Sequence, residues 1–164
     1  METNFLISNA DENDCSSIAD IYNKYLGNGT MDLDPKSSHY FQKWLLNKSP
    51  EEGLYVMRIA DDIIGWGIIK QYSDRRGYQK TAETSVYMDE GWTGKRYGRH
   101  LKEYVMKMAQ KNGFKHLVAK IWASNKGSIK YNLDFGYEIV GTQKKIGFVN
   151  GEWIDVVIMQ YVFE

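Results

Sequence analysis

The chain is poor in several residue types that mark particular protein classes. Its 164 residues include one cysteine and two prolines, which excludes an internal disulfide and a zinc site built from several cysteines. No apolar run approaches the roughly 18 residues needed to span a bilayer, and residues 1–4 lack the basic-then-apolar start of a secretory signal. Lys and Arg together number 21, as do Asp and Glu, which argues against attraction of the whole chain to nucleic acid or anionic membrane. We therefore expect a cytoplasmic protein without nucleic-acid or membrane partners.

The remaining composition suits one folded domain spanning residues 1–164. Apolar residues make up 43% of the chain and aromatic residues 14%, which is enough for a sizeable core and too much for a disordered chain. A chain of this length leaves little room for two domains. It also contains no internal repeat and no linker rich in Pro, Gly or Ser.

The first third of the chain predicts a strand and two helices. Residues 5–7 suit a short strand, and the capping side chains of residues 11–14 precede a helix. Asp34 followed by Pro35 predicts the start of a second helix, which must end before Pro50. We expect this second helix to bury four apolar residues at helical spacing, Tyr40, Phe41, Trp44 and Leu45.

The middle of the chain changes to β periodicity. Two β-rich runs, 54–60 and 63–72, flank Asp61 and Asp62, a pair that predicts a tight hairpin. A polar loop then precedes a further strand at 81–88. Three consecutive strands of this kind predict an antiparallel meander.

Helices and strands alternate after the meander. A turn over 91–98, rich in glycine and basic residues, opens a helix that ends at Asn112 and Gly113. A short strand at 116–122 and a helix at 125–135 follow. The strand at 81–88, the helix and the strand at 116–122 therefore form a β-α-β unit.

Asn150 and Gly151 separate the last two predicted strands and are a strong hairpin signal. The complete order is β-α-α-β-β-β-α-β-α-β-β. A meander followed by a β-α-β unit predicts an α/β (α+β) fold, with a mixed, mostly antiparallel sheet of six to seven strands and helices on both faces.

The loop between the strand at 81–88 and the next helix is the most informative segment. A helix N-terminus offers unpaired N–H groups and a partial positive charge, which favour a phosphate or pyrophosphate. The segment is neither a P-loop nor a G-x-G-x-x-G fingerprint, and an ordinary solvated turn explains it as well. Its glycines and basic residues are Gly91, Gly94, Gly98, Lys95, Arg96 and Arg99.

Glu83 lies within a run that otherwise favours a strand, where glutamate is disfavoured. Two interpretations are open, a solvent-facing position on a half-buried sheet or a general base beside a cleft.

Other titratable residues give weaker signals. His39, His100 and His116 are scattered without the spacing of metal ligands, and Cys15 suits a structural thiol. No serine lies in a G-x-S-x-G elbow. We therefore expect neither covalent nor metal catalysis.

Five segments in the right order resemble the GNAT superfamily of acetyl-CoA-dependent N-acetyltransferases. Within it they are similar to the phosphinothricin and L-amino acid N-acetyltransferase group, and the match spans almost the whole chain. The segments are Ile-Tyr-Asn-Lys-Tyr at 21–25, Arg-Arg-Gly-Tyr at 75–78, Ala-Glu-Thr-Ser-Val-Tyr-Met at 82–88, the helix from Asn125 to Phe-Gly-Tyr at 135–137, and the C-terminal hairpin at 147–155.

The resemblance assigns roles to individual residues. Glu83 matches the catalytic glutamate of the group, and Asn125 is expected to contact acetyl-CoA, with no metal involved. Arg75 and Tyr78, on the loop before the central strand, are expected to bind substrate, although a solvated loop charge explains Arg75 equally well. The backbone of Val86, Tyr87 and Met88 would hold the pantetheine arm and acetyl group. The pyrophosphate would lie on Gly94, Lys95, Arg96, Tyr97, Gly98 and Arg99.

Two departures from the superfamily pattern stand out. Its loop reads Gln/Arg-x-x-Gly-x-Gly/Ala, and here the aligned positions are Thr93, Arg96 and Gly98. Arg96 either crowds the pyrophosphate or binds it through its side chain. Many members also place a tyrosine in the late helix as the general acid for the thiolate, whereas this chain has Tyr131 followed by Asn132. Asn132 cannot supply a proton by titration, so either water or Tyr131 takes this role, or Tyr131 is simply a buried residue.

The implied reaction is direct attack of a neutral amine on the thioester, with Glu83 as the base. Neutralising an α-amine with a pKa near 7.8 costs about 1 kcal/mol at pH 7, against nearly 5 kcal/mol for a lysine-like amine. Together with the resemblance, this cost favours an amino acid as the small-molecule substrate, and the resemblance adds analogues such as phosphinothricin or methionine sulfone. Alternatives are a protein N-terminal or polyamine acetyltransferase, or an acyl-CoA sensor without catalysis. The resemblance also implies a possible homodimer through the C-terminal strands, where Trp153 would suit an interface.

Overall fold

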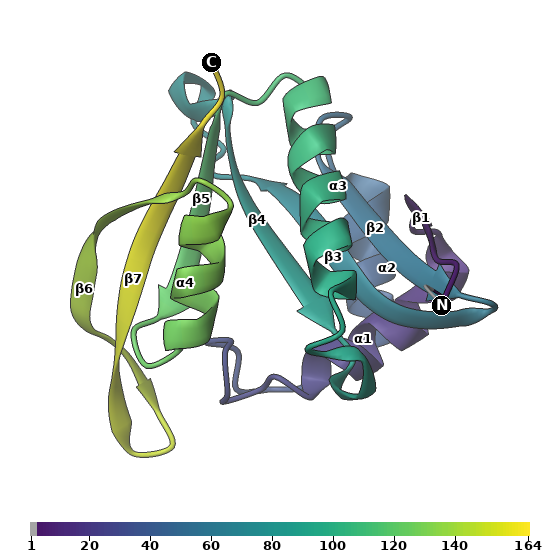
Figure 1. Ribbon diagram of the computed structural model, residues 1–164, viewed down its shortest axis with the longest axis horizontal. Helices are drawn as coiled ribbons and strands as arrows, with labels where there is room; N and C mark the ends of the chain where they lie inside the picture. The colour runs from purple at the N-terminus through teal and green to yellow at the C-terminus, as the bar shows by residue number, and fades with distance from the viewer. Residues whose placement is uncertain (1–2) are drawn as a thin grey trace.

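A seven-stranded sheet in the order β1-β2-β3-β4-β5-β7-β6 forms the centre of the protein (Figure 1). The computed structural model describes residues 3–164, so Met1 and Glu2, considered above with the N-terminus, lie outside the described residues. Neighbouring strands in this sheet are antiparallel except β4 and β5, which are parallel. The strands are β1 (Leu6–Asn9), β2 (Gly53–Ile59), β3 (Asp62–Gln71), β4 (Thr81–Met88), β5 (His116–Trp122), β6 (Glu138–Val149) and β7 (Glu152–Val162).

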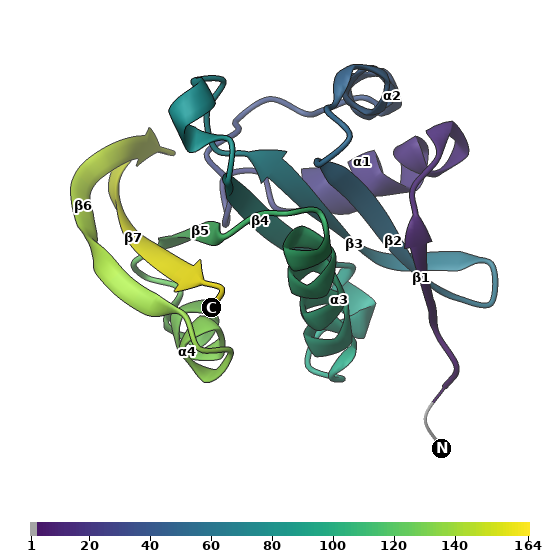
Figure 2. The same cartoon turned by 90° about the horizontal axis from the view of Figure 1, so that it is seen from above.

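Helices cover both faces of the sheet, as Figure 2 shows from above. α1 (Cys15–Asn23) and α2 (Ser38–Asn47) lie on one face, and α3 (Tyr97–Lys111) and α4 (Lys126–Asp134) on the other. The predicted order of elements and the mixed sheet with helices on both faces are thus confirmed. Among residues 3–164, no helix has both the length and the apolar character needed to cross a membrane.

Each face has its own core, built from the helical spacing of apolar residues. On the α3 face, Leu101 and Val105 pack with Ile69 and Met159 of the sheet, and all four are at most 1% exposed. On the other face, Ile18 of α1 belongs to a cluster with residues of α2 and the sheet. Burying each such aliphatic side chain stabilises the fold by about 1.5–3 kcal/mol. The two cores hold the sheet rigid on either side of its centre.

The second helix begins later than predicted. Ser37, rather than Asp34, is the N-cap of α2, and its hydroxyl accepts a hydrogen bond from the N–H of Tyr40 at 3.2 Å. The side chain of Asn23 exchanges two 2.9 Å hydrogen bonds with the backbone of Lys36, which keeps the preceding residues out of the helix. Of the four residues expected to be buried, Phe41 is buried and Trp44 and Leu45 are partly buried against the same core, whereas Tyr40 is 47% exposed.

Two other boundaries differ slightly from prediction. β1 runs two residues further than expected because it pairs with β2 up to Asn9. The first hairpin turn falls on Ala60 and Asp61 rather than on Asp61 and Asp62, and Ala60 takes the positive φ of 52°. At the second hairpin, Asn150 and Gly151 have φ values of 52° and 81°, as the sequence predicts.

Candidate active site

The sheet divides at its centre, where β4 and β5 separate. The two parallel strands pair only from Thr81 with His116 to Glu83 with Val118, and Figure 1 shows them diverging beyond that point. β5 continues instead along β7 as far as Trp122. We call the point of divergence the fork.

The fork leaves one edge of β4 without a neighbouring strand. Odd-numbered residues of β4 bond to β3, as the N–H of Tyr72 donating to the carbonyl of Thr81 shows. The alternation of an antiparallel ladder therefore directs the N–H groups of Val86 and Met88 toward the β5 side, where pairing has already ended. The backbone predicted to hold a pantetheine arm thus faces the opening between the strands.

A cavity of about 1010 Å³ lies on the α1 and α2 face of the fork. Glu83, Ser85 and Tyr87 of β4 and Lys120 of β5 line its floor. Tyr78 also lines it and packs edge-on against Tyr72, with ring centroids 5.4 Å apart. Arg75 is not among the residues that line the cavity, and its role in binding stays a prediction.

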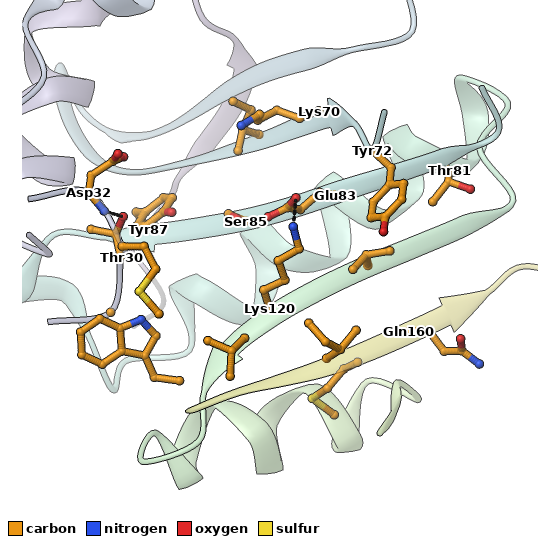
Figure 3. Close-up of a pocket in the computed structure, with 18 of the residues that line it drawn as sticks. Thr30, Asp32, Lys70, Tyr72, Thr81, Glu83, Ser85, Tyr87, Lys120 and Gln160 are labelled. Atoms are coloured by element: carbon orange, nitrogen blue, oxygen red, sulfur yellow. Dashed lines mark hydrogen bonds and ion pairs between the residues drawn. The ribbon is translucent and has the colours of Figure 1, made fainter. Parts of the chain in front are cut away.

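Glu83 points into this cavity between two lysines. Its carboxylate lies 3.1 Å from the ammonium of Lys120, and the two side chains point toward each other in Figure 3. Lys70 on β3 is the direct cross-strand partner of Glu83 and also lines the cavity. The Glu83 side chain is 28% exposed and that of Lys120 is 45% exposed, so a ligand entering the cavity can reach both charges.

Tyr87 anchors the inner end of the cavity in an aromatic cluster. Its ring stacks on Trp66 with centroids 4.6 Å apart and meets Tyr22 at 5.3 Å. Burial raises the pKa of Tyr87 to about 12, so its hydroxyl stays protonated at neutral pH and cannot act as a base. Among the cavity-floor side chains on β4, Glu83 is the one suited to that role.

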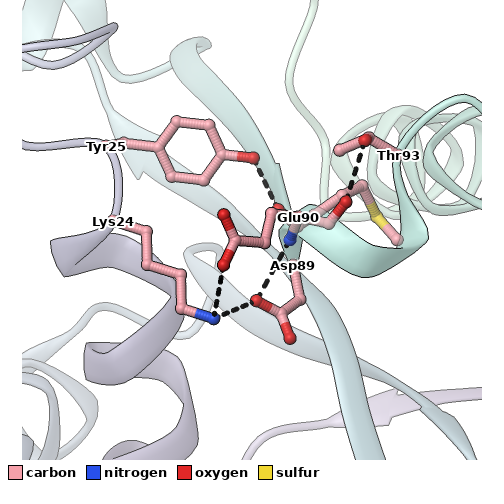
Figure 4. Close-up of polar contacts among 6 residues, drawn as sticks. Lys24, Tyr25, Asp89, Glu90 and Thr93 are labelled. Carbon is pink, nitrogen blue, oxygen red and sulfur yellow. Dashed lines mark hydrogen bonds and ion pairs between the residues drawn. The ribbon is translucent and has the colours of Figure 1, made fainter.

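The loop after β4 is fastened to α1 rather than left free (Figure 4). Lys24 donates to the carboxylate of Asp89 at 2.6 Å, and the hydroxyl of Tyr25 donates to the carbonyl of Met88. Asp89 in turn accepts from the N–H of Glu90 at 3.1 Å. These contacts fix the path of the chain from the end of β4 toward α3.

The N-terminus of α3 is open to an anion. Its N-cap, Arg96, makes no side-chain capping hydrogen bond, so the first N–H groups of the helix lack a side-chain partner. Gly94 and Arg96 have φ values of 72° and 69°, and Arg96 thereby adopts the left-handed conformation that glycine favours. The Arg96 side chain is exposed, which leaves it free to approach a bound anion.

Basic side chains around this terminus make local contacts. Lys95 lies over the ring of Trp92 at 5.1 Å. Arg99 pairs with Glu103 at 3.2 Å and lies 4.9 Å from the ring of Phe135 on the α4 side.

The late helix places its two asparagines in different roles. Asn125 caps α4 by accepting the N–H of Ser128 at 3.0 Å, which leaves its amide N–H₂ for a ligand. Asn132 is 5% exposed and accepts a 2.7 Å hydrogen bond from Lys102 of α3. The hydroxyl of the preceding Tyr131 is buried without a hydrogen-bond partner among the described residues.

The sequence analysis does not predict three lysines of this region as site residues. The pairing of Lys70 with Glu83 follows from the register of β3 with β4, which the long polar loop between these strands does not reveal in the sequence. Lys120 interrupts an apolar strand, which is a weak signal for a functional side chain. Lys102 follows Leu101 on a helix and carries no local signature at all.

Within residues 3–164, no three His, Cys, Asp or Glu side chains lie close enough together to hold a metal ion. The site combines a cavity, a carboxylate at a fork in the sheet and, where the chain passes to the other face, a helix N-terminus without a side-chain cap. These features fit the class of enzymes that transfer a group from an anionic donor to a separate acceptor.

Residues 7–158 match the model of the acetyltransferase (GNAT) domain family, and the chain belongs to this family of acetyl-transferring enzymes. A phosphinothricin N-acetyltransferase of Streptomyces coelicolor is 29% identical over 88% of each chain. An L-methionine sulfoximine/L-methionine sulfone acetyltransferase of Salmonella typhimurium is 26% identical over 92% of this chain and 90% of its own. The fold matches a phosphinothricin acetyltransferase from Sinorhizobium meliloti in complex with acetyl-CoA, with a TM-score of 0.90 and 24% identity over 97% of this chain and 88% of that one.

Proposed function

We propose that the protein transfers the acetyl group of acetyl-CoA to the α-amino group of an amino acid or a close analogue such as phosphinothricin or methionine sulfone. Family membership establishes the acetyltransferase class. The single observation that carries the finer proposal is the carboxylate of Glu83 flanked by Lys70 and Lys120 on the cavity floor.

The donor fits the other side of the fork. The uncapped terminus of α3 suits the pyrophosphate, and the N–H groups of Val86 and Met88 suit the pantetheine arm as an added strand would. A thioester carried along β4 would then reach the fork beside Glu83. There the N–H of Val86 or a neighbour would stabilise the tetrahedral oxyanion.

Glu83 acts as the general base in this scheme. Its carboxylate accepts a proton from the attacking amine, either directly or through a water. An α-amine needs only about 1 kcal/mol to become neutral at pH 7, which an ordinary carboxylate can support.

The two lysines favour an acceptor that carries an acidic group. A zwitterionic amino acid would place its ammonium at Glu83 and its carboxylate at Lys120 or Lys70, replacing one ion pair by two. Opening the existing pair costs little, because half-exposed ion pairs contribute only about 0–1 kcal/mol. A polyamine would meet Lys70 and Lys120 as like charges but would find a second carboxylate, Asp32, in the same cavity, so the polyamine stays an alternative.

The test is a panel of matched acceptors with acetyl-CoA, followed by thiol release. Each amino acid, including methionine sulfone and phosphinothricin, is compared with the amine of the same side chain that lacks the carboxylate. We expect the amino acids to be acetylated with the higher kcat/KM. Equal or greater activity on the decarboxylated amines would contradict the role of the lysines, and acetyl-CoA binding without thiol release from any acceptor would identify a sensor.

We also propose that two copies of the chain associate through the C-terminal hairpin and that the enzyme works in the cytoplasm, where acetyl-CoA is made. β6 is an edge strand whose outer side chains include exposed apolar residues, and such edges are normally covered. Trp153 on β7 is 61% exposed and packs against Phe148 on β6 with ring centroids 4.9 Å apart.

A further inference from the structure

Lys102 is the one buried cationic side chain among residues 3–164, with 8% of its surface exposed. Its ammonium donates to the amide oxygen of Asn132 at 2.7 Å, and it forms no ion pair with any described carboxylate. Aromatic rings surround the rest of it, with Tyr137 at 4.5 Å, Phe135 at 5.6 Å and Tyr131 at 6.0 Å from the nitrogen.

Such an environment is unfavourable for a charge. A buried ammonium loses its hydration, and one amide oxygen with three aromatic faces restores only part of it. A methionine of similar length would fill the same space without that cost. Burial lowers the pKa of Lys102 to about 8, so the side chain exchanges its proton near neutral pH.

Lys102 lies near the fork, on the face of the sheet opposite to Glu83. The hydroxyl of Tyr137, whose ring contacts the ammonium, lies 3.4 Å from the hydroxyl of Thr84 on β4. Thr84 is next to Glu83, and successive side chains of a strand point to opposite faces. Glu83 therefore faces the acceptor cavity, while Lys102 lies behind β4 at the same level on the α3 and α4 face. Gly98, at the predicted pyrophosphate site, is one helical turn before Lys102.

We propose that Lys102 donates the proton that the departing thiolate of CoA requires, with Asn132 as its positioning residue. The inference rests on the proposed function, which brings the thioester to the fork. The amine nitrogen forms a bond to the carbonyl carbon and passes a proton to Glu83. The tetrahedral intermediate then breaks its C–S bond, and the sulfur keeps the electron pair and takes a proton from the ammonium of Lys102. Glu83 releases its proton to water and Lys102 regains one, leaving amide and thiol as products.

The CoA thiol and the ammonium of Lys102 have similar pKa values. An ordinary thiol has a pKa near 8.5, close to that of Lys102, and proton transfer is efficient between groups of similar pKa near the working pH. Tyr131 and Tyr137 face the ammonium from α4 and the segment after it, and burial raises the pKa of each to about 12. The nearby ion pair of Arg99 and Glu103 lies on α3 itself. Lys102 is thus the group in this cluster that titrates near pH 8.

The test compares Lys102→Met with Lys107→Met, which removes an exposed lysine from the same helix. We expect kcat of Lys102→Met at pH 7 to fall about 10²–10⁴-fold, the range for a lost proton donor, with binding of acetyl-CoA and KM for the acceptor unchanged. The wild-type rate should decline as the pH rises past about 8, and this decline should be absent in Lys102→Met and present in Lys107→Met. Wild-type kcat, or an unchanged basic limb, in Lys102→Met would overturn the proposal.

A second measurement does not depend on turnover. CoA bound to the wild type should form its thiolate, followed by ultraviolet absorbance, at a lower pH than CoA bound to Lys102→Met, because the ammonium stabilises the anion. The same thiolate titration curve in both proteins would overturn the proposal even if Lys102→Met were poorly folded in the kinetic assay. A wild type that acetylates no acceptor would contradict the proposed function, while the thiolate titration would still decide the position of Lys102.

Discussion

At the scale of single residues, Glu83 and Lys102 lie on opposite faces of β4 in contrasting environments. Glu83 on the cavity face is paired with Lys120 at 3.1 Å and remains partly exposed. Lys102 on the opposite face is buried and paired only with an amide. The cavity-facing pair can open to a substrate at little cost, whereas the buried lysine has a fixed position. The exposed environment of Glu83 suits a residue that binds an incoming substrate. The buried environment of Lys102 suits a residue that donates a proton to one fixed position.

Glu83→Gln tests the first of these roles. The amide keeps the shape of the side chain but cannot accept the proton of the amine, so we expect kcat to fall about 10²–10⁴-fold. Acetyl-CoA affinity, measured by calorimetry, should stay the same, because the proposed donor site lies along the other side of the fork. Glu90→Gln, which changes a carboxylate that is 83% exposed beside α1, should keep normal turnover. Normal turnover in Glu83→Gln would eliminate this residue as the base.

Lys102 also predicts how stability varies with pH. Its pKa is about 8 in the folded protein and about 10.4 in the unfolded chain. Between these values the unfolded state binds more protons, so the penalty present below pH 8 is relieved as the pH rises. The relief amounts to roughly 3 kcal/mol by pH 10.4. Urea unfolding should show Lys102→Met more stable than wild type at pH 7, with a difference that shrinks toward pH 10. A difference that is constant with pH would contradict the lowered pKa.

Candidate site residues can be predicted from the sequence only where a residue stands out from its local pattern. Glu83 interrupts a strand pattern, which marks it as a candidate, and its role as the base stays a prediction. Lys102 looks like any exposed helical lysine, because its burial comes from Asn132 and the aromatic rings of a segment 30 residues later. Contacts between helices of this kind leave no trace in local periodicity.

At the scale of elements, the loop after β4 connects the fork to the start of α3, and α1 holds this loop in place. α1 ties the loop after β4 through Lys24 and Tyr25, and α3 then returns along the opposite face (Figure 2). Strand 81–88, strand 116–122 and the late helix were predicted almost to the residue, because their turn and cap residues are strong local signals. The start of α2 was not, since the tertiary contact of Asn23 with Lys36 overrides the signal of Asp34 and Pro35.

Gly98→Val tests the placement of the donor at this terminus. A Cβ at Gly98 would lie 3.3 Å from Met88 and 4.0 Å from the hydroxyl of Tyr131, so branched methyl groups would fill the space between α3 and the end of β4. We expect acetyl-CoA affinity to fall at least about tenfold, or 1.4 kcal/mol. Gly91→Val is the matched control, because an added Cβ there meets nothing within 4 Å. Equal affinities of the two variants in calorimetry would contradict the assignment.

At the scale of the whole molecule, the proposed function places acceptor and donor on opposite sides of the fork, and the C-terminal hairpin lines the cavity on the proposed acceptor side. β6 contributes Val140, Gln143 and Ile146 to the cavity wall, although most of its residues are exposed. A second copy of the chain packed against β6 would cover its exposed apolar side chains and so stabilise this wall of the cavity.

Trp153→Glu tests that association. Symmetric pairing of two hairpins would bury Trp153 in both copies, and a buried unpaired carboxylate costs several kcal/mol. We therefore expect wild type to sediment at twice the chain mass and Trp153→Glu to sediment as a monomer. Leu46→Glu, at a position on α2 that is 85% exposed, should sediment as wild type does. Because β6 also lines the cavity, we expect KM for the acceptor to rise in Trp153→Glu while acetyl-CoA affinity is kept. A wild type that stays monomeric at every concentration would contradict the dimer and leave the fork chemistry of each chain untouched.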